Sequence, residues 1–429
     1  MKGNRKTFVG FGFGPIQSGL FLYEAVMSGN FDRFVIAEVD EDAVEAVNSN
    51  GGRYVVNIAR PNRIDGSAVN GVEMYNPADP SGRGKILEAV IESDEMAVCL
   101  PSVDFYDAGG TTSVSGIIVK ALALKADDAP AVIYAAENNN RAAEILHESI
   151  AAHSDGIFPG CVRTLNTVIG KMSGIVDSSR EIRRLGLNPM TPGMCRAILV
   201  EEFNRILVSR IDLRGYNRGI EVFSEKEDLL PFEEAKLYGH NAVHAVIGYL
   251  ADFEGLARIA DAGLHSEIVK IAYRVFLRES GPALIRRHGH TGDPLFTEDG
   301  YRLYAEDLIE RMINPNLNDL TSRICRDHVR KLGYSDRLYG TMRLALDCGI
   351  EPVNLALGTA ACIMSMQKSA GKGKKVSRDN AVCDSLAAGS IEDLLMSVWK
   401  DEADHHAEKL IDMTVESYRL LKSSGLITD

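Results

Sequence analysis

The fold of this chain is decided by FVGFGFGPIQSG, residues 8–19, which continues a short apolar run near the N-terminus. The glycines fall where a buried strand would turn into a helix. Gly12 permits the tight turn, and Gly14 lets a pyrophosphate approach the main chain at the helix N-terminus. The strand–turn–helix context makes this match more specific than an isolated glycine-rich run. We therefore predict a dinucleotide-binding turn.

The pattern departs from the usual one at its third glycine, where the chain has Gln17. We expect Gly19 to provide the close helix–strand packing instead. An acid at the tip of the second strand accepts hydrogen bonds from the adenosine ribose and repels a 2′-phosphate. Glu38 ends that predicted strand and indicates NAD rather than NADP. Asp40 is the competing acid, but it lies beyond the strand and is expected to begin the next helix.

The first half of the chain alternates apolar runs with amphipathic stretches. This alternation predicts a parallel sheet covered by helices on both faces, in a Rossmann-type domain over residues 1–215. The expected strands are 7–11, 33–38, 96–100 and 131–135, with further candidates at 198–207 and 219–223. The expected helices are 16–28, 41–48, 114–125 and 141–153.

Helical periodicity dominates the second half and predicts a mainly α-helical substrate domain over 216–429. Pro231, followed by Glu233 and Glu234, is typical of a helix start, because acids favour the N-terminal dipole. A lysine-rich segment, 369–375, is expected to be an exposed loop. The expected helices are 231–262, 265–289, 301–313, 318–332, 335–348, 351–368 and 391–424.

The composition restricts the partners of the chain. With 429 residues and a net charge of -13, it is expected to have two domains and not to bind nucleic acid non-specifically. Neither a signal peptide nor a membrane span is predicted. The seven cysteines form no CxxC pair, which favours a reducing cytoplasm over a disulfide framework. The expected partner is a small molecule.

The most informative helix is 232–244, FEEAKLYGHNAVH. At 3.6 residues per turn, Lys236, Asn241 and His244 fall within an arc of about 140°. Buried polar groups on an apolar helix need partners, which suggests a shared site. His240 and His244 have the spacing of metal ligands, but neither an HExxH motif nor a third ligand accompanies them. We therefore predict no metal.

These residues resemble a known signature. Lys236, Asn241 and His244 reproduce the K-x4-N-x2-H pattern of the polyol-specific long-chain dehydrogenases, most closely the mannitol-1-phosphate branch. The resemblance covers nearly the whole chain and weakens after about Ile363. Further segments similar to the family are FGFGPI at 11–16, AENNNR at 136–141, VE at 200–201, ESG at 279–281, NPNLND at 314–319, RKL at 330–332 and DRL at 336–338.

The resemblance implies roles for these residues. Lys236 would be the general base, and Asn241 and Asn138 would donate hydrogen bonds to the developing alkoxide. His244 would orient the substrate or Lys236. Glu233 matches an acid that some family members use near a proton exit route. The implied NAD-binding set is Gly12, Gly14, Pro15, Ile16, Gln17, Gly19, Glu38, Pro101 and Asn138.

A phosphate on the substrate would need cationic ligands. By resemblance these are Arg330 and Lys331, with Arg337 as a further candidate. The plain alternative is that these side chains only pair with Asp327 or Asp336.

The expected reaction is the NAD-dependent interconversion of mannitol 1-phosphate and fructose 6-phosphate, in a monomer or weak homo-oligomer. One alternative is a hexuronate reductase that acts on a sugar acid. A catalytically silent NAD sensor on the same fold is the alternative from another functional class.

Overall fold

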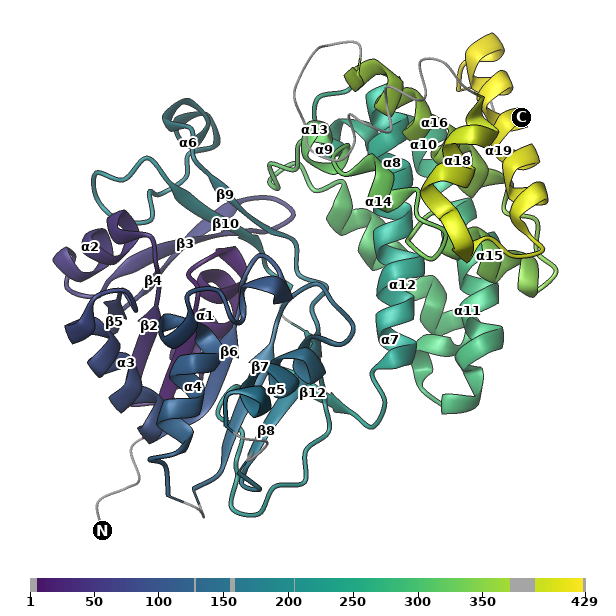
Figure 1. The fold of residues 1–429 in the computed structure, drawn as a ribbon. Coiled ribbons are helices and arrows are strands. Elements are labelled where there is room, and N and C mark those ends of the chain that lie inside the picture. The colour runs from purple at the N-terminus through teal and green to yellow at the C-terminus, as the bar shows by residue number, and fades with distance from the viewer. Residues whose placement is uncertain (1–5, 127–128, 155–158, 204, 371–389, 427–429) are drawn as a thin grey trace. The chain divides into compact units, whose positions relative to one another are not determined.

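The computed structural model describes residues 6–126, 129–154, 159–203, 205–370 and 390–426. The chain divides into two compact units, Met1–Leu230 and Pro231–Asp429 (Figure 1). Most of the predicted lysine-rich loop at 369–375 lies outside the described residues.

The first unit is built on a mainly parallel eight-stranded sheet, as the alternation of strands and helices predicts. Its strand order is β12-β11-β8-β7-β6-β1-β2-β5, and the six strands from β8 to β5 are all parallel. The strands are β1 (Thr7–Phe11), β2 (Arg33–Ala37), β5 (Val72–Tyr75), β6 (Ser93–Val98), β7 (Ala131–Ala135), β8 (Val162–Val168), β11 (Ile206–Ser209) and β12 (Phe223–Lys226).

A second sheet of four strands was not predicted. Its order is β4-β3-β10-β9, from β3 (Tyr54–Ala59), β4 (Ile64–Val69), β9 (Ser173–Val176) and β10 (Ala197–Glu201). The single strand predicted at 198–207 is therefore two strands, β10 and β11, in different sheets. Because β12 pairs with β11, the first unit extends past the predicted boundary at 215 to Leu230.

Helices cover the eight-stranded sheet. As predicted, Asp40 begins the helix that follows β2: its side chain accepts a hydrogen bond from the Ala43 amide, 3.3 Å away. The helices are η1 (Gln17–Phe21), α1 (Leu22–Ser28), α2 (Glu41–Ser49), α3 (Pro80–Glu92), α4 (Val114–Leu122) and α5 (Ala142–Ala152); α6 (Ser179–Leu185) instead connects β9 to β10 of the second sheet.

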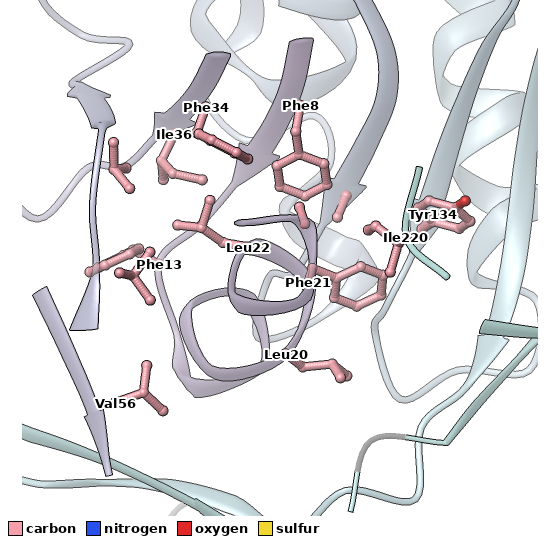
Figure 2. Packing of buried hydrophobic residues seen from close by; sticks show 14 of the residues in the cluster. Phe8, Phe13, Leu20, Phe21, Leu22, Phe34, Ile36, Val56, Tyr134 and Ile220 are labelled. Carbon is pink, nitrogen blue, oxygen red and sulfur yellow. The ribbon is translucent and has the colours of Figure 1, made fainter. Parts of the chain in front are cut away.

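The core of the first unit lies on both faces of the sheet, because successive strand side chains point to opposite sides. On one face, Phe8, Phe34 and Ile36 pack with residues of η1 and α1 (Figure 2). This cluster includes Val56 of the second sheet, so η1 and α1 are buried between the two sheets. On the opposite face, Val9 and the alternate side chains of the strands pack against α3, α4 and α5. The glycine-rich turn is thus anchored at both of its ends.

The second unit is helical. The helix predicted at 391–424 is interrupted between Trp399 and Ala407. Its elements are α7 (Leu230–Glu234), η4 (Ala235–Asn241), α8 (Ala242–Phe253), α9 (Ile259–Ala262), α10 (Ser266–Arg274), η5 (Val275–Ser280), α11 (Gly281–His288), α12 (Glu298–Met312), α13 (Thr321–Ile324), α14 (His328–Lys331), α15 (Tyr339–Asp347), α16 (Val353–Ala370), α18 (Ile391–Trp399), η8 (Lys400–Glu402) and α19 (Ala407–Ser424). Within the described residues, no helix has the length and apolar character needed to span a bilayer.

Candidate active site

The glycine-rich turn has the geometry that a phosphate group needs. Gly12 has φ +83°, and a Cβ there would lie 2.6 Å from the carbonyl oxygen of Cys99. Only glycine fits this position. A Cβ built on Gly14 would meet nothing within 4 Å, so there is open space beside this part of the main chain. An anion can approach the backbone here.

The departure at Gln17 has a structural explanation. Gln17 is fully buried, and a Cβ on Gly10 would lie 2.2 Å from its Nε2. The glycine that permits close helix–strand packing is therefore in β1 rather than in the helix. Gly19 also packs closely, as predicted, but its neighbour is Val200 of β10, 2.4 Å from a built Cβ. The run FVGFG already contained Gly10, but the usual pattern gives it no role.

Glu38 lies at the turn, immediately after the end of β2. Its Oε2 accepts a hydrogen bond from the Phe13 amide at 2.5 Å, and its Oε1 accepts from the Val39 and Asp40 amides at 2.7 and 2.8 Å. The side chain of Asp40 instead pairs with Arg196, whose hydrogen bond is the main reason that the pKa of this carboxyl lies below its usual value. Glu38 is thus the acid fixed beside the glycine-rich turn.

A cavity of about 510 Å³ opens beside this turn, where β1, β2, β6 and β7 end. In a parallel sheet this edge is where ligands bind. Its lining is largely apolar. Of the predicted cofactor residues it includes Gly12, Gly14, Pro15, Ile16, Glu38 and Pro101, whereas Gln17 and Gly19 lie buried in the helix behind it.

A buried carboxyl supports the rim of this cavity. Glu137 follows β7, and its Oε1 accepts a hydrogen bond from the Leu100 amide at 2.8 Å. Its Oε2 accepts from the Tyr106 hydroxyl at 2.5 Å, and burial raises the pKa of Glu137 to about 6. This network joins the end of β7 to the segment that carries Pro101. Asn138, the next residue, is exposed at the strand end.

In the second unit, Lys236 and Asn241 lie on a π-helix, η4, inserted between α7 and α8. The prediction assumed the 3.6-residue repeat of an α-helix. In a π-helix the hydrogen bonds join residues five apart, so Lys236 and Asn241 share one face of η4. The widened turn also brings Gly239 against a neighbouring helix: a Cβ there would lie 2.7 Å from the hydroxyl of Tyr301. Such insertions are frequent at functional sites.

The environment of Lys236 suits a general base. Burial lowers the pKa of its ammonium to about 8, and the nearby positive charge of Arg337 acts in the same direction. Glu233 has the opposite effect. His240, one turn further on, is buried, and mainly for that reason its pKa lies well below the usual value. A neutral amine is therefore accessible near neutral pH.

His244 has a partner that the sequence did not reveal. Its Nε2 lies 2.9 Å from Oδ2 of Asp319, and the guanidinium of Arg323 binds the other carboxylate oxygen at 2.7 Å. Asp319 belongs to the NPNLND segment, which was noted only for its resemblance. The spacing of the motif gives no direct sign that it reaches α8.

The Glu234 carboxylate connects α7 to α11. Glu234 Oε2 lies 2.6 Å from His288 Nε2 and 3.1 Å from Arg287 Nε. His288 was expected only to end a helix, and it does so at α11. The pair attaches α7, and with it the residues before Lys236, to α11.

The two predicted phosphate ligands lie in different surroundings. Within the described residues, the ion-pair contacts of half-exposed Arg330 are long, 3.8 Å to Asp327 and 4.0 Å to Asp336. Arg337, the further candidate, pairs with Asp336 at 2.8 Å. Lys331 is buried, and its ammonium donates hydrogen bonds to the carbonyl groups of Ile324 and Arg326. A direct contact of Lys331 with a substrate phosphate stays a prediction, and these two hydrogen bonds already hold its ammonium inside the fold.

One group in the described part of the chain has donor atoms close enough together to hold a metal ion: Asp347, His405 and His406, within 4.8 Å of one another. His406 Nε2 already pairs with Asp347 at 2.8 Å. The group contains none of the predicted catalytic residues.

The family model and the sequence relatives that match this chain point to the same family. Residues 228–417 match the sequence model of the mannitol dehydrogenase C-terminal domain. The mannitol-1-phosphate 5-dehydrogenase of Bacillus licheniformis is 27% identical over 94% of this chain and 97% of its own length. That of Caldanaerobacter subterraneus is 26% identical over 85% and 88%.

Two solved structures share the fold. A D-sorbitol dehydrogenase in substrate-free form has a TM-score of 0.78 at 15% identity, covering 99% of this chain and 94% of its own. Mannitol 2-dehydrogenase of Pseudomonas fluorescens, in a ternary complex with NAD and D-mannitol, has a TM-score of 0.75 at 15% identity, covering 99% and 93%.

Proposed function

We propose that this chain interconverts mannitol 1-phosphate and fructose 6-phosphate. Its C-terminal domain matches that of the mannitol dehydrogenase family, which consists of NAD-dependent oxidoreductases that act on CH–OH groups of polyols. The similarity to mannitol-1-phosphate dehydrogenases over nearly the whole chain supports this substrate. The observation that carries the proposal is the π-helix that presents Lys236 and Asn241 on one face.

The first unit fits NAD. The open space at Gly14 and the left-handed turn at Gly12 suit a pyrophosphate, and Glu38 suits the adenosine ribose. Pro15, Ile16 and Pro101 would line the same cavity, whereas Gln17 and Gly19 would shape the helix behind the turn. When bound, NAD accepts the hydride that leaves the substrate carbon.

The protein groups handle the proton and the oxygen. Neutral Lys236 would take the proton of the substrate hydroxyl, which its lowered pKa permits near neutral pH. Asn241, and by resemblance Asn138, would donate hydrogen bonds to the oxygen as negative charge develops on it. His244, held by Asp319, would orient the substrate or Lys236. No step of this scheme requires a metal.

The substrate phosphate requires a positive partner. Arg330 is exposed and weakly paired, and Arg337 contributes positive charge beside Lys236. We therefore assign phosphate binding to Arg330, while Arg337 pairs with Asp336 and Lys331 supports the turn at 324–326 from within the fold. An arginine fork binds phosphate with two parallel hydrogen bonds, which distinguishes it from a lysine.

The test is NADH formation with mannitol 1-phosphate, mannitol and mannonate, each with and without a chelator. We expect a preference for the phosphate ester that the chelator does not change. Arg330→Ala should raise KM for the phosphate ester about tenfold or more, the value of one charge-assisted hydrogen bond, and leave mannitol unaffected. Arg326→Ala, a nearby exposed arginine, is the matched control. Turnover of mannonate alone would move the function to sugar acids.

A further inference from the structure

The C-terminal part of the chain is packed onto a loop of the substrate domain. Trp399, at the end of α18, is buried to 1% exposure, and its Nε1 donates a hydrogen bond to the carbonyl of Leu332 at 2.9 Å. Its ring meets those of Tyr334 and Tyr339 edge-on, with 4.8 Å between centroids in each pair. Leu332 and Tyr334 belong to the irregular segment 332–337 that connects α14 to α15.

A second contact fixes the same loop. Asp404 Oδ1 accepts a hydrogen bond from the Tyr334 hydroxyl at 2.5 Å, and Asp404 Oδ2 pairs with Arg343 at 2.6 Å. The guanidinium of Arg343 lies over the Tyr334 ring, 4.2 Å from its centre. Tyr334 is thus held by its hydroxyl and by its ring. We call residues 399–404, which interrupt the predicted last helix, the C-terminal strap.

The other end of the loop contacts the catalytic π-helix. Thr341 is fully buried, and its Oγ1 lies 2.5 Å from the carbonyl oxygen of Arg337 and 3.3 Å from that of Tyr238 in η4. Gly340 packs so closely that a Cβ there would lie 2.8 Å from the Tyr238 ring. The loop is therefore attached to the strap at one end and to the helix of Lys236 at the other.

We propose that the C-terminal strap is a positioning element of the active site: Asp404 and Trp399 hold the 332–337 loop through Tyr334 and Leu332, and so keep Arg337 beside Lys236. This inference rests on the proposed role of Lys236 as the base. It assigns a function to residues 399–404, for which the sequence predicted none and which lie inside the family match at 228–417.

The consequence is electrostatic. Among the described residues of the second unit, the charged groups that shift the pKa of Lys236 are Arg337, which itself pairs with Asp336 at 2.8 Å, and Glu233; His240 nearby is neutral. Arg337 disfavours the ammonium form, and Glu233 favours it. A loop released from the strap lets Arg337 move away while Glu233 stays one turn before Lys236. The pKa of Lys236 then rises, so its ammonium loses its proton, and can act as a base, only at higher pH.

The test compares pH profiles of kcat/KM for polyol oxidation between pH 6 and 10 at saturating NAD. Tyr334→Phe keeps the ring against Trp399 and Arg343 but removes the hydroxyl that binds Asp404. Asp404→Asn removes the charge. Lys409→Ala is the control, because Lys409 also joins α19 to the rest of the unit, through Glu351, without touching the loop.

In both variants, Tyr334→Phe and Asp404→Asn, we expect the pH at which kcat/KM reaches half of its high-pH value to rise by about 0.5–1 unit. Above that pH, kcat/KM should come close to the wild-type plateau. The control should follow the wild-type profile. A purely structural role would lower activity by the same factor at every pH, and unshifted midpoints in both variants would overturn the inference. If Asp404→Asn does not fold, the pH profile of Tyr334→Phe alone tests the inference.

The proposed function fails in a different way. A wild-type profile without a midpoint near pH 8 that depends on Lys236 would refute the base itself. A wild-type midpoint that is present but unmoved in the variants would refute only the strap.

Discussion

His244 Nε2 and Asp319 Oδ2 lie 2.9 Å apart, and this bond joins α8 to the segment before α13. Burial opposes ionisation of Asp319, but the hydrogen bond and charge of His244, together with Arg323, prevail and keep the pKa of the carboxyl below its usual value. The contribution of this carboxylate to folding stability is therefore present above the ordinary carboxyl range and is lost as the pH falls below it.

Asp319→Asn should lower kcat about 10–100-fold, because a hydrogen bond to a charged group contributes about 1.5–3 kcal/mol and His244 would lose its fixed orientation. Steady-state kinetics at pH 8 measure this. Asp261→Asn, which removes a carboxylate paired with Arg258, is the control and should leave kcat unchanged. A kcat within twofold of wild type for Asp319→Asn would contradict the role of the pair.

The π-helix gives a second prediction. Gly239→Ala places a methyl group 2.7 Å from the Tyr301 hydroxyl, and we expect it to cost about 1–3 kcal/mol of unfolding free energy and to lower kcat. Tyr301→Phe removes the atom that clashes. The double variant should therefore recover much of the loss, measured by chemical denaturation and by kcat. Strictly additive effects of the two changes would show that this contact does not hold η4.

Much of the first unit could be predicted from the sequence, because its signals are local. The apolar strand 7–11, the turn with Gly12 and Gly14, and Glu38 at the tip of the second strand follow from residue types at fixed spacing. The second sheet escaped prediction, since strands such as IDGSAV at 64–69 combine glycine, aspartate and serine, which strands disfavour.

The candidate site was predicted as a set of residues but not as a geometry. Periodicity assumes the α-helical repeat, so it cannot reveal the π-helix at 235–241. Likewise, the charged run at 400–406 resembles an exposed helix face and contains no glycine or proline to mark a break, yet Lys400 has φ 50° and the helix stops there. The contact of Asp319 with His244 joins residues 75 positions apart and depends on tertiary packing alone.

Substitution of Gln17 tests folding stability rather than catalysis. Both polar atoms of its side-chain amide are buried and have no hydrogen-bond partner among the described residues. Gln17→Met keeps the shape and removes the unpaired amide, so we expect the free energy of unfolding to rise by about 1–2 kcal/mol. Urea denaturation of the wild type and the variant measures this. Destabilisation by Gln17→Met would mean that the amide is satisfied.

Cofactor preference should depend on Glu38 rather than on Asp40. Glu38→Gln keeps a hydrogen-bonding side chain but removes the charge that repels a 2′-phosphate, so the preference for NAD over NADP should fall about tenfold or more. Asp40→Asn should keep the preference, because Asp40 pairs with Arg196 and caps α2. The ratio of kcat/KM with the two cofactors measures both. A larger effect from Asp40→Asn would reverse the assignment.

The central claim is that Lys236 is the base, and one measurement tests it most directly: kcat/KM for NAD reduction by mannitol 1-phosphate across pH 6–10, in wild type and in Lys236→Ala. Since the neutral amine must accept the proton, we predict that wild-type activity rises through a midpoint near the pKa of about 8 and that the reverse reduction falls through the same region. Lys236→Ala should lose about 100-fold or more and lack this midpoint, while Lys270→Ala, an exposed lysine, should match wild type. A Lys236→Ala enzyme that keeps both the rate and the midpoint would contradict the account.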